Sequence, residues 1–162
     1  MSQAKATRRR GFTTIELVMT IVMLGVLAAI GLPKFLNFGR DARVAAVESA
    51  KGAIVSAANI AMIKCQTVPN CYRSSRGAGL TGPNGEFNHM HNGFPTGRTR
   101  PNNYFGIKDW VQMEGFTITE PYFTQTEFSK DGAPDPANCK VTYVETQIIG
   151  VFPRVVSTID GC

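Results

Sequence analysis

A single apolar run near the amino terminus constrains this chain more than any other feature. From Phe12 to Leu32 the sequence is FTTIELVMTIVMLGVLAAIGL, and Glu16 is the one charged residue in it. A run of this length can cross a bilayer as a helix, which needs about 20 apolar residues. A secretory signal would have a short apolar core followed by a small-residue cleavage site, and no A-x-A sequence follows this run. The sequence therefore predicts a membrane helix that is kept in the protein.

The basic residues before this run predict its orientation. Four of them lie in the first ten positions, namely Lys5, Arg8, Arg9 and Arg10. Cytoplasmic flanks of membrane helices carry an excess of Lys and Arg. We therefore expect the leader in the cytoplasm and everything after Pro33 outside.

The junction between leader and run resembles the class III signal of type IV prepilins. The leader ends in Gly11, Phe12 follows it, Glu16 is the fifth residue after the junction, and Pro33 closes the run. The resemblance implies that a prepilin peptidase cuts between Gly11 and Phe12 and methylates the new amine of Phe12. The processed chain would have 162 − 11 = 151 residues and a net charge of 13 − 12 = +1. The basic character of the full sequence therefore gives little support to nucleic-acid binding.

Glu16 is the residue in the run that most needs an explanation. A carboxylate within a membrane helix costs about 2.5–3.5 kcal/mol on insertion scales, and such residues are functional by default. Cleavage at Gly11 would create an amine on Phe12, one helical turn from Glu16. The prepilin resemblance implies that Glu16 pairs with the N-terminal amine of a neighbouring subunit during assembly. The alternative is a side chain that merely reaches toward the membrane interface.

The helix is expected to continue beyond the membrane. Apolar residues recur at mostly three-, four- and seven-residue spacings, which is typical of one face of an amphipathic helix: Leu36, Val44, Val47, Ile54, Ala58 and Met62. Pro33 removes a backbone donor and glycine lowers helix propensity, so the helix is expected to bend near Gly25, Gly31 and Pro33. The predicted organisation is a cleaved leader (1–11), a membrane or filament-core helix (12–33), its amphipathic continuation (34–65) and a globular head (66–162).

The head is predicted to be a small antiparallel sheet preceded by a turn-rich region. Residues 73–103 are rich in Gly, Pro and Asn and indicate a long loop, and a brief helix is expected around Lys108–Met113. Stretches rich in β-branched and aromatic residues predict strands within 115–128, 141–152 and 153–159. The expected fold class is α+β, like that of type IV pilins, with the long helix packed on the sheet.

Three further stretches narrow the resemblance to the MSHA-type (mannose-sensitive haemagglutinin) branch of type IV pilins. They are PKFLNFGRDAR…KGAI after the membrane run, GFPTG in mid-chain, and a tail of the form CKVTY…TIDGC. The middle of the chain, from Gln66 to Gln125, gives no alignment beyond this. A cysteine pair at Cys65 and Cys71 also departs from the simplest pilin pattern, which has a single C-terminal disulfide.

The four cysteines are expected to staple the head. All of them, Cys65, Cys71, Cys139 and Cys162, follow the membrane run, and an external compartment favours disulfides. Four cysteines allow three connectivities. We favour a Cys65–Cys71 clip at the end of the helix together with Cys139–Cys162, the second being the pairing that the family resemblance implies. A zinc site is the alternative, although the spacings are not of the paired C-x-x-C type.

Several motifs invite enzymatic or ligand-binding interpretations. Residues 77–82, GAGLTG, fit G-x-G-x-x-G, but RSSR precedes them and PNG follows, so the strand and helix of a dinucleotide site are missing and a glycine loop is expected. His89 and His91 would form a metal pair on an extended segment, against which a surface loop is favoured. Asp131 and Asp135 form a turn cluster that supports only a weak calcium hypothesis.

Basic and aromatic residues of the loop region are a further candidate surface. They are Arg73, Arg76, Arg98 and Arg100, with Tyr72, Phe94 and Tyr104 interleaved. Such a surface can bind single-stranded DNA, carbohydrate or an anionic cell surface, whereas solvated loop charges are the plainer interpretation. A filament that displays many copies would gain avidity from weak sites of this kind.

The sequence as a whole predicts a structural subunit, with no catalytic constellation, cofactor or metal expected. Its expected partners are further copies of itself, the prepilin peptidase, the pilus assembly machinery, and a surface ligand that the sequence does not identify. The precursor is expected in the bacterial inner membrane and the processed chain in an extracellular pilus used for adhesion, attachment or motility. The alternatives are a type II secretion pseudopilin, a minor pilin, and a membrane-anchored enzyme with an uncleaved leader.

Overall fold

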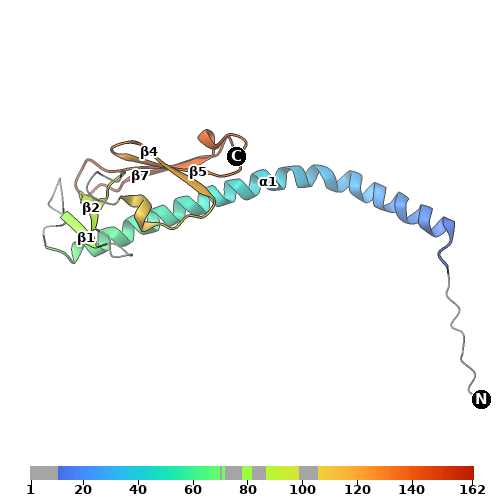
Figure 1. The fold of residues 1–162 in the computed structure, drawn as a ribbon, viewed down its shortest axis with the longest axis horizontal. Coiled ribbons are helices and arrows are strands. Elements are labelled where there is room, and N and C mark those ends of the chain that lie inside the picture. Colours follow the sequence, from blue (N-terminus) through green and yellow to red (C-terminus); the bar gives the residue numbers. More distant parts are fainter. Residues whose placement is uncertain (1–10, 70, 72–77, 82–86, 99–105) are drawn as a thin grey trace, which may run out of the picture. The chain divides into compact units, whose positions relative to one another are not determined.

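A long helix and two antiparallel sheets make up the fold in the computed structural model, which describes residues 11–69, 71, 78–81, 87–98 and 106–162. The helix, α1, runs from Thr14 to Gln66 (Figure 1). The chain divides into two compact units, residues 1–39 and residues 40–162. We describe each unit by itself.

The first unit contains the apolar part of α1, whose side chains from Phe12 to Ile30 have no cover within the described residues. Every large apolar side chain from Phe12 to Ile30 is at least half exposed. The stretch Thr14–Gly31 is long and apolar enough to span a membrane, and Phe38–Gln66 also meets this test of length and composition, although one third of it is buried within the protein. Side chains as apolar as those of Thr14–Gly31 need lipid or another protein as their surroundings.

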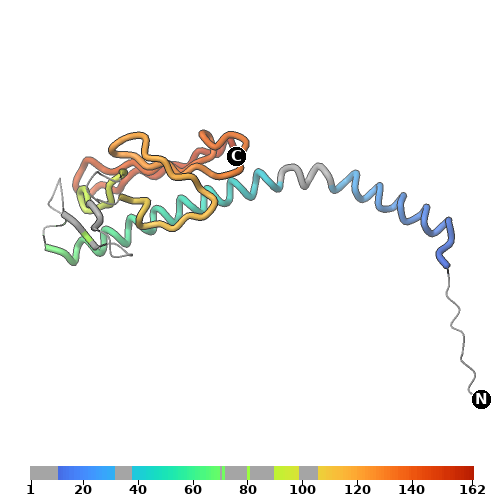
Figure 2. The backbone as a smooth tube through the Cα atoms, viewed as in Figure 1, coloured from blue at the N-terminus to red at the C-terminus, as the bar shows by residue number. Residues whose placement is uncertain are grey.

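In the second unit, α1 presents a buried stripe to the sheets. Val47, Ile54 and Ala58 are completely buried, as the helical spacing of the sequence predicts. Small residues complete the stripe and let the helix approach the head closely: Ala50, Ala57 and Ala61. Figure 2 shows this part of α1 running alongside the strands of the head, and the two share one core cluster.

A four-stranded antiparallel sheet supplies the other half of this core. It consists, in spatial order, of β4 (Phe116–Tyr122), β5 (Gln125–Lys130), β6 (Lys140–Val144) and β7 (Arg154–Thr158). Phe128 of β5 lies opposite Val141 of β6, and both are completely buried. Alternate residues of the two central strands therefore face α1, which is the period-2 pattern of a half-buried sheet. The predicted α+β class, a long helix packed on an antiparallel head, is confirmed.

The long loop predicted for residues 73–103 is wrong in part, because a second sheet lies there. Its three antiparallel strands are β1 (Ala78–Thr81), β2 (Phe87–His91) and β3 (Phe94–Pro95). Leu80 and Met90 are buried in a second core cluster with Ala61 and the first cysteine pair. Strands as short as these show no clear period in the sequence.

Smaller differences concern element ends. The brief helix expected at Lys108–Met113 is a 3-10 turn, η2 (Ile107–Trp110), and another, η3 (Pro136–Asn138), precedes Cys139. The predicted strand region 115–128 is a hairpin that turns between β4 and β5. The predicted region 141–152 is strand only as far as Val144, and residues 145–153 form a loop.

Two disulfides tie these elements together, and they join the pairs favoured from the sequence. Cys65–Cys71 links the end of α1 to the segment after it, and Cys139–Cys162 closes a stretch of 23 residues around β6 and β7. Arg43 of α1 donates from Nε to the backbone oxygen of Cys162 at 2.6 Å. The second disulfide is thereby anchored to the helix, next to which Figure 1 marks the C-terminus.

Candidate assembly site at the start of the helix

Thr13 and Glu16 form a reciprocal capping box at the first turn of α1. The backbone N–H and the hydroxyl of Thr13 donate to Oε2 of Glu16, at 3.0 and 2.9 Å. The backbone N–H of Glu16 lies 3.3 Å from the Thr13 hydroxyl oxygen, which accepts it. These are the bonds of an S/T-x-x-E cap, in which each residue satisfies a backbone donor of the other. Thr13 was not among the residues predicted to matter, although the T-x-x-E spacing is present in the sequence.

The capping box places a carboxylate at the positive end of a helix within an apolar surface. Negative charge is stabilised at a helix N-terminus because the first backbone N–H groups are unpaired there. Within the described part of the chain, both hydrogen bonds to the Glu16 carboxylate come from Thr13 and go to the same oxygen. A hollow of about 430 Å³ borders the carboxylate and is lined by Phe12, Ile15, Glu16, Met19 and Thr20. The hollow leaves room for a cationic group beside the carboxylate.

The junction residues lie outside the helix. Gly11 and Phe12 precede the first helical residue, Thr14, and both are exposed. An exposed junction outside the helix is accessible to a peptidase, whereas a bond within a regular helix has its backbone groups engaged. The leader itself, residues 1–10, lies outside the described residues. Gly25 and Pro33 both lie within the helical stretch, and the bend predicted there stays a prediction.

His91 does not lie in the surface loop predicted for it. It ends strand β2, next to the completely buried Met90, and its Nδ1 is 3.3 Å from Oε1 of Glu145. The Glu145 carboxylate is itself buried and also accepts the backbone N–H of Gly97, at 2.8 Å from Oε2. The contact joins the end of β2 to the loop that follows β6. Within the described residues, no three His, Cys, Asp or Glu side chains come together as a metal site would require.

Asp131 and Asp135, the carboxylates of the calcium hypothesis, accept hydrogen bonds from nearby residues of the head. Asp131 accepts the Thr117 hydroxyl at 2.7 Å. Asp135 accepts the backbone N–H of Ala137 at 3.1 Å and the side-chain amide of Asn138 at 2.7 Å, which caps η3. Both carboxylates therefore act as turn residues, as Asp does in many turns.

The candidate basic and aromatic surface is only partly described. Phe94 is 2% exposed and packs edge-on against Phe152, so it belongs to the core and not to a surface. Arg98 lies over the ring of the exposed Phe123, 4.8 Å from its centroid. The remaining members lie outside the described residues: Tyr72, Arg73, Arg76, Arg100 and Tyr104. Of the G-x-G-x-x-G motif, Ala78–Thr81 forms strand β1, so these residues are not the glycine loop that was expected.

Comparison with known proteins gives partial matches to type IV pilus subunits. The chain is 39% identical over 64 residues to the type IV narrow pilus major component PilA5 of Thermus thermophilus, over 40% of this chain and 55% of that protein. It is 29% identical over 77 residues to a type IV major fimbrial protein FimA of Dichelobacter nodosus, over 48% of each. The chain spans about half the length of the curated relatives it matches. No family model and no solved structure matches it.

Proposed function

We propose that this chain is a pilin, a structural subunit that polymerises into a type IV pilus. The observation that carries the proposal is the start of α1. An exposed Gly11–Phe12 junction lies directly before a capped helix whose apolar side chains are uncovered and whose first turn holds Glu16. The partial matches to major pilus and fimbrial components support the same function. Its role is structural, and its main partner is a further copy of the chain.

Assembly follows from the chemistry of the first turn. A prepilin peptidase cuts after Gly11 and methylates the Phe12 amine, which then carries a positive charge beside the apolar helix surface. The Glu16 carboxylate of a subunit already in the fibre pairs with that amine, because opposite charges attract strongly in a low-dielectric environment. The apolar helices leave the bilayer together and bury one another in the fibre core. The precursor thus resides in the inner membrane and the product outside the cell.

The finer assignment is to the MSHA-type branch, as a major subunit. The tail from Cys139 to Cys162 and the GFPTG turn that ends in Gly97 carry it, as resemblances in the sequence. Both stretches have defined contacts in the head. The tail forms a disulfide loop that is hydrogen-bonded to α1, and the GFPTG turn packs against the start of β5. These contacts support the interpretation of both stretches as structural motifs.

The test is intact-mass spectrometry on fibres sheared from cells that express the full chain with a prepilin peptidase. The expected species begins at N-methylated Phe12 and is four hydrogens lighter before reduction than after it, because two disulfides are present. The variant Gly11→Glu should keep residues 1–11 and form no fibres. A processed chain confined to the membrane fraction would favour a pseudopilin or a minor pilin. A leader retained by the unaltered chain would overturn the proposal.

A further inference from the structure

The loop between β6 and β7 displays apolar side chains to solvent. This β6–β7 loop, residues 145–153, contains the neutral sequence QIIGVF. Ile148 and Ile149 are 64% and 58% exposed, and Val151 and Phe152 are also exposed. Contiguous exposed apolar side chains mark interaction surfaces in soluble domains.

The β6–β7 loop is ordered, so its apolar side chains are presented in a fixed arrangement. The Thr146 hydroxyl donates to the Ile148 carbonyl and accepts the Ile148 N–H, at 3.0 and 3.2 Å. The Val151 N–H donates to the Ile148 carbonyl at 3.3 Å, across Gly150, whose φ of 80° lies in the region that glycine favours. An ordered loop loses less conformational entropy on binding than a flexible one.

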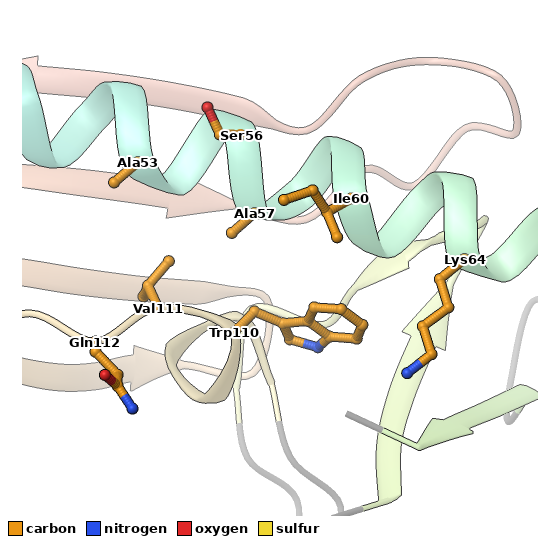
Figure 3. A pocket seen from close by; sticks show the side chains of 8 residues that line it. All are labelled: Ala53, Ser56, Ala57, Ile60, Lys64, Trp110, Val111 and Gln112. Atoms are coloured by element: carbon orange, nitrogen blue, oxygen red, sulfur yellow. The ribbon is translucent and has the colours of Figure 1, made fainter. Parts of the chain in front are cut away.

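A groove of complementary character lies between α1 and η2. This Trp110 groove has a volume of about 550 Å³ and is lined by Ala53, Ser56, Ala57, Ile60, Lys64, Trp110, Val111 and Gln112 (Figure 3). Such a volume is within the range of about 300–1,000 Å³ found for sites that enclose a ligand. Figure 3 shows Trp110 and Val111 on one side, facing Ala57 and Ile60 of the helix, with Lys64 at one end.

The side chain of Trp110 has a hydrogen-bond donor that is not satisfied within the described part of the chain. Its indole nitrogen Nε1 is buried and has no hydrogen-bond acceptor among the described residues. A buried donor without an acceptor costs free energy. The ammonium of Lys64 is 5.9 Å from the Trp110 ring centroid. The QIIGVF stretch of the β6–β7 loop, residues 147–152, has no charged side chain and can enter beside this cation without like-charge repulsion.

We propose that the β6–β7 loop of one copy docks in the Trp110 groove of the next copy. The inference rests on the proposed pilin function and names the head-to-head contact of the fibre. The loop does not fill the groove of its own chain, since Ile148 and Ile149 are mostly exposed. The two surfaces differ, so each docked copy still offers a free groove at one side and a free loop at the other. A contact of this heterologous kind propagates into an open helical polymer unless its rotation closes a ring.

The test is disulfide crosslinking in assembled fibres. The double variant Ser56→Cys with Ile149→Cys places one new thiol in the groove and one on the loop, both at exposed positions. The expected product is a ladder of dimers and higher multimers that disappears on reduction, because each copy is joined to two neighbours. The matched control pairs Ser56→Cys with Thr119→Cys on the exposed face of β4 and should stay monomeric.

Each outcome of this experiment bears on one proposal. Fibres of the Ser56→Cys, Ile149→Cys variant without a ladder would overturn the docking contact and leave the pilin function intact. A third variant pairs Ser56→Cys with Leu24→Cys instead of Ile149→Cys. A ladder from this variant alone would mean that the apolar helix of the neighbour occupies the groove, and would overturn the loop contact. Failure of the unaltered chain to form fibres would count against the pilin function.

A second variant covers the case in which added cysteines prevent assembly. Ile148→Ser with Ile149→Ser changes only exposed side chains, so the head should fold normally. Removal of both apolar side chains should raise the concentration of unassembled chain in equilibrium with fibres by about tenfold or more. Thr117→Ser with Thr119→Ser is the control on β4. An unchanged concentration for the isoleucine variant would contradict the docking contact.

Discussion

Gly97 is enclosed by backbone on one side and by a buried carboxylate on the other. A Cβ added to it would clash with the carbonyl oxygen of Thr124, a contact that the backbone cannot accept without moving. The same residue donates its N–H to Glu145 and accepts the Thr126 hydroxyl. The GFPTG turn therefore requires glycine at its last position for a steric reason.

Gly97→Ala should lower the free energy of unfolding by about 1–3 kcal/mol, the usual cost of forcing extra atoms into a packed site. Denaturant titration of the full chain in detergent measures this change. Gly52→Ala is the matched control: it lies in α1 with open space around it, and should raise stability by about 0.5–1 kcal/mol. Equal stability of the two variants would refute the steric argument.

The buried side chain of Tyr143 makes the stability of the head depend on pH. Burial raises the pKa of its phenol well above the ordinary value, and the nearby Glu145 carboxylate raises this pKa further. Its hydroxyl donates to the Pro95 carbonyl at 2.7 Å. An acid whose pKa is raised by folding stabilises the fold below its unfolded pKa, and the stability is lost as the pH rises above that value. Since tyrosine in an unfolded chain titrates near pH 10, the loss begins there.

The free energy of unfolding should therefore fall above about pH 10, by up to about 1.4 kcal/mol per pH unit from this one group. Tyr143→Phe should remove that contribution to the slope, and should also destabilise the protein at neutral pH by about 1–3 kcal/mol because the Pro95 carbonyl loses its donor. Tyr122→Phe, at an exposed position, is the matched control. Denaturant titrations between about pH 8 and 11 span the ordinary tyrosine pKa of about 10 and measure this slope for each variant.

At the scale of elements, the two disulfides differ in the length of chain that they close. Their sequence separations are 6 residues for Cys65–Cys71 and 23 for Cys139–Cys162. In the chain-entropy model the longer loop stabilises more, by about 3.4 kcal/mol against about 2.2 kcal/mol. Replacing both cysteines of each pair by alanine in turn should therefore cost more for Cys139–Cys162. Thermal unfolding of the two variants tests the order, and the reverse order would mean that local packing, not loop length, decides.

The elements that the sequence predicted are those with a regular period. The stripe with Val47, Ile54 and Ala58 repeats at helical spacing, and the strands around Phe128 and Val141 are rich in β-branched and aromatic residues. The three-stranded sheet was not predicted because its strands are short, and because Leu80 and Met90 pack with Ala61 and Cys65 of α1, outside the sheet. Tertiary contacts of that kind leave no local pattern to read.

The candidate assembly site was predictable for a related reason. Gly11, Phe12 and Glu16 form a contiguous pattern, and the T-x-x-E spacing that identifies Thr13 as the cap is equally local. The contact between His91 and Glu145 was not predictable, because it joins residues 54 positions apart, 145 − 91, one at the end of β2 and one in the loop after β6. Local chemistry can be found in a sequence, whereas a contact between distant segments needs the fold.

At the scale of the whole molecule, Glu16 has two roles that substitution can separate. It caps α1 through Thr13, and under the proposed function it carries the charge that pairs with a neighbour's amine. Glutamine can occupy the third position of a capping box but has no charge. Alanine removes both the cap and the charge. Because α1 is long, loss of its cap alone should cost only about 0.5–2 kcal/mol of helix stability.

Glu16→Gln and Glu16→Ala should therefore both insert in the membrane and be processed after Gly11, yet both should form far fewer fibres than the unaltered chain. The fibre yield per processed chain, measured by shearing and quantitative blotting, is the readout. Thr13→Ala, which removes the hydroxyl of the cap and keeps the carboxylate, is the matched control and should retain most of the yield. If Glu16→Gln assembled normally while Glu16→Ala and Thr13→Ala did not, the carboxylate would act as a helix cap and the pairing of charges between subunits would be wrong.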